Sequence, residues 1–137
     1  MSLLSRKTLA KKLLENRSFR KQYVWEQLKR SLPFQMRTMR DMRKWSQERT
    51  ARELNKTQSV ISRFESPAYG RMTLQTLVEI AEGFDVGLLI KFVPFSRLVR
   101  EYEDVSFAAL SVASVDDTEE AKKLEAWAAE GDPDSKP

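Results

Sequence analysis

The sequence predicts a mainly helical fold with an N-terminal helical extension, a compact group of helices and a single β-strand. Two patterns indicate this fold class. Apolar residues recur every three or four positions over most of residues 5–84, as they do on one face of a helix. Over residues 86–93 every second residue belongs to an apolar series, which is typical of a strand. The 137 residues suffice for one domain with an extension at each end.

Residues 1–31 are expected to form the helical extension. One amphipathic helix is predicted for residues 5–15 and a second for residues 18–30. The extension either packs on the rest of the chain or serves as a dimerisation arm. We favour packing, because large side chains such as Tyr23 and Trp25 need burial.

Residues 32–85 are expected to form a compact helical domain. Pro33 suits the first turn of a helix, where its missing N–H has no helical partner in any case, so a helix is predicted for residues 33–44. Shorter helices follow at residues 46–53, 57–65 and 73–84. The connections centre on Asn55 and on residues 66–71.

Residues 86–100 are expected to hold a C-terminal β-strand that pairs across a dimer. A lone strand leaves its backbone groups unpaired, and no other segment has a convincing strand pattern. The simplest partner is the same strand of a second copy. The alternative is an apolar extension that covers the helical core. The side chains assigned to dimerisation are Val86, Leu88, Ile90 and Phe92.

Residues 101–137 are expected to form an acidic tail that is partly disordered. Residues 104–116 lack strong periodicity and are predicted to be a linker, whereas residues 117–130 are predicted to be a helix. The tail either solvates the chain or docks on a protein partner through Trp127. Its acidic composition favours the solvating role.

Charge divides the chain and limits its chemistry. Residues 1–100 carry 21 Lys and Arg against 9 Asp and Glu, whereas residues 101–137 carry 3 against 11. A basic body suits a phosphate backbone. The sequence has no Cys and no His, so disulfides, thiolate or imidazole metal sites and Ser-His or Cys-His catalysis are not expected. We therefore expect no catalytic residues, metal or cofactor.

The sequence shows no pattern of a membrane-spanning segment or a signal peptide. No segment approaches the roughly 20 apolar residues that cross a bilayer. The first residues lack the apolar run of a signal peptide. A cytoplasmic location without membrane attachment is the expectation.

The most informative segment is residues 39–65. Ser46 and Thr57 can each cap a short helix, and Asn55 between them tolerates the left-handed backbone of a tight turn. The apolar residues of the segment would form a buried wedge that sets the angle between the helices: Met39, Trp45, Leu54, Val60, Ile61 and Phe64. Polar side chains of types that read base edges are left on the outer side: Gln58, Ser59, Ser62 and Arg63.

This segment resembles the helix-turn-helix of the Cro and phage-repressor type, the XRE family, over about residues 34–89. The resemblance implies a five-helix repressor-like domain that places residues 57–65 in the major groove. It also implies that Arg40 and Glu65 form an internal ion pair. The base contacts it implies are Thr57, Gln58, Ser59, Ser62 and Arg63. The phosphate contacts are Ser46, Gln47, Arg43, Lys56 and Arg71.

The sequence departs from the family pattern at several positions. Asn55 replaces the usual glycine, and Thr50 and Lys56 replace usual apolar residues. After Asp85 the pattern is extended where the family has a fifth helix. These departures concern the geometry of the dimer more than the DNA-binding unit.

Four functions are consistent with the sequence to different degrees. The first is a sequence-specific transcriptional regulator, a repressor that binds double-stranded DNA as a homodimer. The second is an antitoxin that represses its own operon and binds a toxin through its terminal segments. An enzyme is poorly supported, because no pocket motif or phosphate loop is present. A protein-interaction module without DNA binding should tolerate loss of Gln58 and Arg63.

Overall fold

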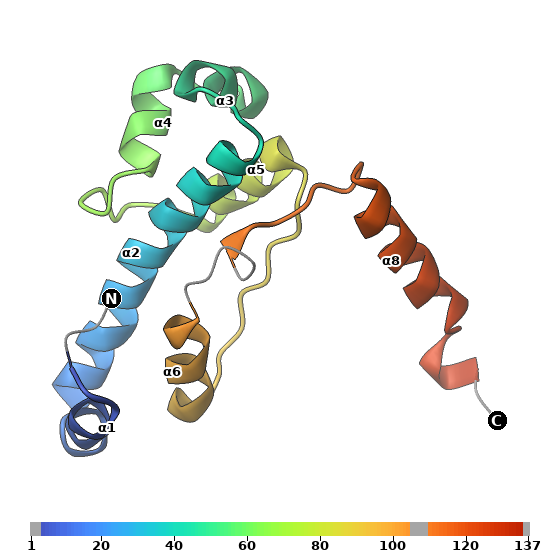
Figure 1. Ribbon diagram of the computed structural model, residues 1–137. Helices are drawn as coiled ribbons and strands as arrows, with labels where there is room; N and C mark the ends of the chain where they lie inside the picture. The colour runs from blue at the N-terminus through green and yellow to red at the C-terminus, as the bar shows by residue number, and fades with distance from the viewer. Residues whose placement is uncertain (1–3, 105–109, 136–137) are drawn as a thin grey trace.

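The computed structural model describes residues 4–104 and 110–135. In Figure 1 the long helix α2 crosses the molecule, with α3, α4 and α5 at its C-terminal end and α1 folded back at its N-terminal end. The described helices are α1 (Arg6–Glu15), α2 (Arg17–Met42), α3 (Gln47–Leu54), α4 (Gln58–Phe64), α5 (Leu74–Phe84), α6 (Phe95–Glu103), α8 (Thr118–Ala129) and a short 3₁₀ turn, Pro133–Ser135. The predicted helical class is confirmed.

Helix α2 corrects the expectation of two separate helices. It begins after Asn16, whose Oδ1 accepts a hydrogen bond from the N–H of Phe19 at 2.9 Å, and it continues through Pro33. Proline removes one N–H from the helical ladder, and its ring crowds the carbonyl four residues earlier. On this helix Pro33 is itself buried, together with Met36 and Met39. Burial on the domain side therefore favours continuation of the helix over a break.

Helices α3 and α4 are capped as their sequences predict. The Oγ of Ser46 accepts a hydrogen bond from the N–H of Arg49 at 3.0 Å, and Thr57 Oγ1 accepts one from Val60 at 3.3 Å. Between the helices Asn55 has φ 54° and ψ 46°, which confirms the left-handed turn. Thr50 is fully buried, and its hydroxyl donates to the carbonyl of Ser46 at 2.9 Å.

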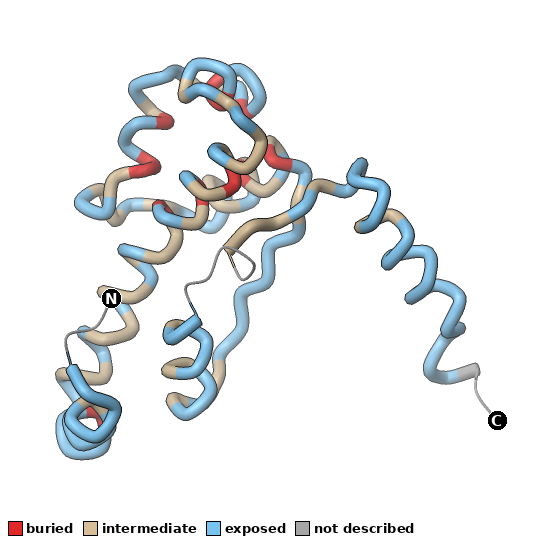
Figure 2. Tube along the Cα trace, in the orientation of Figure 1, coloured by how far each residue is buried: buried red, intermediate tan, exposed pale blue. Residues whose placement is uncertain are grey.

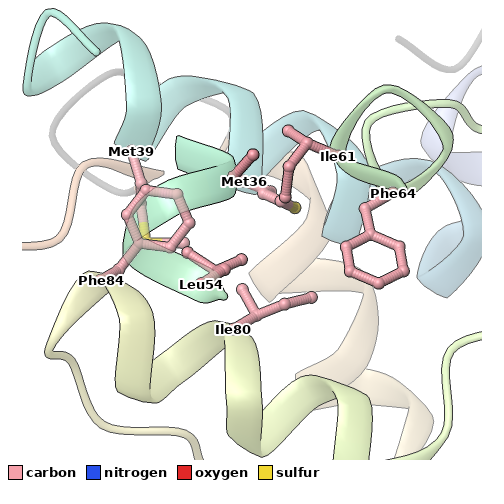
Figure 3. Packing of buried hydrophobic residues seen from close by; sticks show 8 residues of the cluster. Met36, Met39, Leu54, Ile61, Phe64, Ile80 and Phe84 are labelled. Atoms are coloured by element: carbon pink, nitrogen blue, oxygen red, sulfur yellow. The ribbon is translucent and has the colours of Figure 1, made fainter. Parts of the chain in front are cut away.

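The core lies where α2, α3, α4 and α5 meet (Figures 2 and 3). Trp45 packs against it and stacks on Phe84, with ring centroids 5.4 Å apart. The wedge predicted between the helices is confirmed, since its members are buried or packed on this core. The buried cluster consists of Met36, Met39, Ala51, Leu54, Ile61, Phe64, Ile80 and Phe84.

Gly83 allows α5 to approach α3 closely. A Cβ at this position would meet Cδ1 of Leu54 and would lie 2.6 Å from its Cγ and 3.2 Å from its Cα. Gly83→Ala is therefore expected to lower the free energy of unfolding by about 1–3 kcal/mol through overpacking, despite the better helix propensity of alanine. Urea denaturation followed by circular dichroism measures the change.

Gly87→Ala is the matched control, because a Cβ there would meet no atom within 4 Å. It should change stability by less than about 0.5 kcal/mol. Equal stabilities of the two variants would contradict the close helix contact.

Residues 86–94 differ from the prediction of a strand. The segment is extended, but no β-strand occurs in residues 4–104 or 110–135, because no described segment forms a backbone ladder with it. Leu88, Leu89, Ile90 and Phe92 are exposed. Val86 instead lies against the core, and its N–H donates to the carbonyl of Ala81 at 2.9 Å.

Helix α6 corrects two expectations, because residues 95–100 were expected to belong to the strand segment and residues 101–103 to the acidic tail. Its sequence places Phe95, Leu98, Val99 and Tyr102 at helical spacing, a pattern that follows directly after Pro94. Helix α6 contacts α1, at the N-terminal end of the chain, through an ion pair between Glu103 and Arg6.

The segment after α6 is partly held by the helical group. Of the predicted linker, residues 105–109 lie outside the described residues. Val112 packs on the core, and its carbonyl accepts a hydrogen bond from Arg43 at 3.0 Å. The N–H of Val115 donates to the carbonyl of Asp85 at 3.1 Å. The end of this segment therefore packs on the helical group and does not form the linker that was expected.

The predicted last helix is confirmed as α8. The carboxylate of Asp117 caps it by accepting hydrogen bonds from Glu119 and Glu120 at 3.0 and 3.2 Å. No residue of α8 is buried, and Figure 1 shows it apart from the other helices. Among the described helices none is both long and apolar enough to cross a membrane.

Candidate nucleic-acid interface

Helix α4 separates a buried face from a polar face. Ile61 and Phe64 point into the core, whereas Gln58, Ser62 and Arg63 are exposed. Within the described residues, these three exposed side chains take part in no hydrogen bond or ion pair. Ser59 is also exposed, and its Oγ lies 3.1 Å from Oγ1 of the capping Thr57. The polar face of α4 is thus available for an external partner.

The C-terminus of α4 is fixed by a buried ion pair. Glu65 is only 3% exposed, and its carboxylate is held by Arg40 through Nε–Oε2 at 2.6 Å and Nη2–Oε1 at 3.0 Å. This hydrogen bonding raises the pKa of Arg40. The pair predicted from the family resemblance is confirmed.

Two further side chains converge on Glu65. The amide of Gln47 donates to its Oε1 at 3.2 Å, and Arg37 donates to its backbone carbonyl at 3.4 Å. Glu65 therefore joins α2, the first turn of α3 and the end of α4. Because three elements meet at one carboxylate, the polar face of α4 has a fixed orientation relative to the N-terminus of α3.

This arrangement agrees with the comparison to protein families. A family model described as helix-turn-helix matches residues 36–90. These residues form a helix-turn-helix domain of the XRE family. No curated protein and no solved structure matches the chain. The domain is the DNA-binding module of transcription regulators, and in it α3 and α4 are the two helices that flank the turn at Asn55.

Of the flanking residues predicted to contact phosphates, Arg43 is committed to the scaffold. Its guanidinium donates to the carbonyls of Met39, Phe84 and Val112 at 3.0–3.1 Å. It also lies over the rings of Trp45 and Phe84. Burial lowers the pKa of Arg43. The helix-turn-helix domain thus uses this arginine to hold its core, so we leave it out of the proposed DNA interface.

Lys56 is also engaged within the domain. Its Nζ lies 2.6 Å from Oε2 of Glu79 on α5, and both residues line a groove between α3 and α5. Lys56 replaces an apolar residue of the family pattern, and the pair with Glu79 explains how the domain accommodates its charge. We leave Lys56 out of the proposed interface as well.

The remaining flanking residues lie near the N-terminus of α3 and in the loop after α4. Ser46 is exposed at the N-cap of α3, next to Gln47, and Arg71 is exposed in the loop that follows α4. In the described residues, the side chain of Arg71 makes no ion pair. Its loop also contains Gly70, which has φ 57°.

Sequence reasoning missed the neighbours of this loop. A Cβ on Gly70 would lie 3.3 Å from Cδ of Lys29 and 3.7 Å from Cζ2 of Trp25, both on the N-terminal half of α2. The sequence did not indicate this contact, because Pro33 predicts a helix boundary between this half of α2 and the domain.

No group of three His, Cys, Asp or Glu residues in the described part of the chain is arranged to hold a metal ion.

Proposed function

We propose that this protein is a sequence-specific regulator of transcription that acts as a repressor, binding a palindromic operator as a homodimer. Helix α4 would enter the major groove. The observation that carries the proposal is the exposed polar face of α4. Its Gln58, Ser62 and Arg63 side chains have no hydrogen-bond or ion-pair partner in the described chain, whereas every buried side-chain N or O atom of the described residues has one. Groups that are exposed and unbonded on a rigid support suit recognition of an external surface.

The side chains on this face match the donors and acceptors of base edges. Gln58 can pair with N6 and N7 of adenine, and Arg63 with O6 and N7 of guanine. Ser59, Ser62 and Thr57 can donate or accept beside them. Backbone contacts would come from the N-terminus of α3 and the loop after α4, through Ser46, Gln47 and Arg71.

Selection of bound duplexes from random DNA tests this function. The full chain should enrich one sequence whose two half-sites are related by a two-fold axis and lie about 10 base pairs apart. Recovery of no common sequence by the folded protein would contradict sequence-specific regulation. Recovery of a single unrepeated site would contradict the palindromic operator.

Dimerisation is proposed through residues 86–94. Apart from the N–H of Val86, this segment presents an extended backbone that forms no ladder in the described structure, together with exposed apolar side chains, of which Phe92 is fully exposed. Pairing with the same segment of a second copy would satisfy both. Val86 lies on the core, so the proposed contact is confined to residues Leu88 to Phe92.

Sedimentation of the full chain should give twice the 15.9 kDa chain mass. Ile90→Lys should shift it to the monomer mass, because a charge would be buried at the contact. Leu124→Lys, at another exposed apolar residue, is the control and should leave the dimer intact. A monomeric wild-type chain bound to its palindromic site would overturn this dimer contact.

An antitoxin is the second candidate, and one observation favours it. Helix α8 exposes Leu124 and Trp127, the latter to 70%, although aromatic side chains of this size usually find a contact surface. The product of a neighbouring gene should then co-purify with the full chain and be lost when Trp127 is replaced by alanine, while DNA affinity is unchanged. Retention of that product by the variant would contradict binding through Trp127.

A further inference from the structure

The positive charge of the protein lies mostly outside its helix-turn-helix domain. Residues 1–35 contain nine Lys and Arg against two Glu. Residues 36–90, the part that matches the family, contain nine Lys and Arg against seven Asp and Glu. A DNA-binding protein gains affinity by neutralising phosphates. The domain alone therefore carries little net positive charge for that purpose, whereas the segment before it carries more.

Internal pairing reduces the free charge of the domain further. Four of its nine cations form ion pairs with carboxylates: Arg40 with Glu65, Arg49 with Glu53, Arg52 with Glu48 and Lys56 with Glu79. Two more, Arg37 and Arg43, donate to backbone carbonyls. Within the described residues only Lys44, Arg63 and Arg71 carry side chains that are free to meet phosphates.

The N-terminal helices show the opposite pattern. We define the basic arm as α1 together with residues 17–30 of α2. Only Arg6 and Lys29 in the arm form ion pairs in the described structure. Six other cations are exposed and have no carboxylate within 4.0 Å among the described residues, and one of them, Lys12, lies over the ring of Phe19. The five free cations are Lys7, Lys11, Arg17, Lys21 and Arg30. The arm therefore holds more free positive charge than the domain does.

The basic arm is attached rigidly to the proposed DNA interface. Helix α2 is continuous from Arg17 to Met42, so the arm and the first helix of the domain are one element. At the junction, Lys29 and Trp25 lie against the loop at Gly70, next to Arg71. In Figure 1 the arm extends on the side where α4 and this loop lie, whereas the acidic helix α8 lies on the opposite side.

The length of the arm matches the spacing of DNA contacts. From Arg37 to Arg17 the helix rises by about 30 Å, at 1.5 Å per residue. This distance is close to one turn of B-DNA, about 34 Å. Side chains of the arm can therefore reach phosphates beyond the base pairs that lie under α4.

We propose that the basic arm is a second DNA-binding element that contacts the phosphate backbone of duplex flanking the operator, without reading its sequence. The proposal rests on the proposed function of the domain. The arm would supply the salt-dependent part of the affinity, whereas α4 would supply the choice of sequence. The loop that carries Arg71 would join the two contact surfaces.

The test uses the full chain with the five free cations of the arm changed to glutamine: Lys7→Gln, Lys11→Gln, Arg17→Gln, Lys21→Gln and Arg30→Gln. Glutamine has a helix propensity close to that of lysine and arginine, so the arm should remain helical. The control variant loses the same number of charges elsewhere, at Arg52, Arg97, Arg100, Lys122 and Lys123. Circular dichroism and thermal melting verify that both variants fold.

The DNA probes are the selected operator alone, the operator with about 10 base pairs of flanking duplex on each side, and a random duplex of the longer length. At about 0.1 M salt the arm variant should bind the longer operator about 10- to 100-fold more weakly than wild type, which corresponds to the loss of one or two phosphate contacts. The slope of log affinity against log salt should become shallower by about one to two. The ratio of operator to random affinity should stay unchanged.

Two results would overturn the proposal. One is wild-type affinity and salt slope in the folded arm variant, which would leave the acidic tail or another acidic protein as the partner of the arm. The other is an equal loss in the control variant, which would assign the effect to net charge. If selection yields no operator, the random duplex still tests the arm, so failure of sequence recognition is distinguishable from failure of the arm.

Discussion

Glu65→Gln is expected to lower the free energy of unfolding by about 3 kcal/mol. The carboxylate of Glu65 is 3% exposed and the side chain of its partner Arg40 is 15% exposed, so solvent screens the pair weakly. Glutamine keeps the size of the side chain but removes its charge, and its amide presents a donor to the donors of Arg40 and Gln47. The guanidinium is then left buried without a counter-charge. Urea denaturation followed by circular dichroism measures the loss.

Two further variants identify the cause of this loss. Glu53→Gln removes a carboxylate from the exposed pair with Arg49 and should cost about 0.5 kcal/mol or less. Replacement of both Arg40 and Glu65 by leucine removes the buried charges together and should be more stable than Glu65→Gln. A Glu65→Gln variant as stable as Glu53→Gln would show that the pair does not hold the three helices together.

The sequence was sufficient where the determining interactions are local. Ser46 and Thr57 cap helices through hydrogen bonds to residues three positions away. Asn55 adopts the left-handed conformation that its position between two caps requires. The polar side of α4 follows in the same way, because burial of Ile61 and Phe64 at helical spacing determines which residues face outward.

The sequence was insufficient where remote contacts decide the surroundings of a residue. Pro33 indicates a helix boundary locally, but burial against the domain keeps α2 continuous. Arg43 carries the charge of a phosphate contact, but its guanidinium donates hydrogen bonds to the carbonyls of Phe84 and Val112. These acceptors are 41 and 69 residues away along the sequence. Lys56 is likewise neutralised by Glu79, on another helix. Propensity and spacing carry no information on such partners.

Residues 86–103 show a second source of disagreement between the prediction and the structure. Alternating apolar residues at 86–93 and the helical spacing at 95–102 are adjacent, and extending the first pattern hid the second. Residues 86–94 form no backbone hydrogen-bond ladder with any described segment. A strand is defined by its pairing with a partner, so its own sequence does not suffice to predict it.

Arg63→Ala is expected to weaken binding to the selected operator by about 1–3 kcal/mol, which is roughly 5- to 150-fold. The Arg63 side chain is exposed at the end of α4 and has no ion pair within the described structure, so its removal should leave the fold intact and delete one of the proposed base contacts. Gln58→Ala should have an effect of similar size at a different base pair. Repeating the selection with each variant identifies the position at which preference is lost.

The matched control is Arg52→Ala. Arg52 is exposed, but it lies on α3 and pairs with Glu48, so its replacement should alter operator affinity less than about threefold. Arg71→Ala should weaken operator and random duplex alike, because a phosphate contact carries no sequence information. If Arg63→Ala and Gln58→Ala behaved as Arg71→Ala does, α4 would bind DNA without reading it. The choice of operator would then have to come from DNA shape or from elements other than α4.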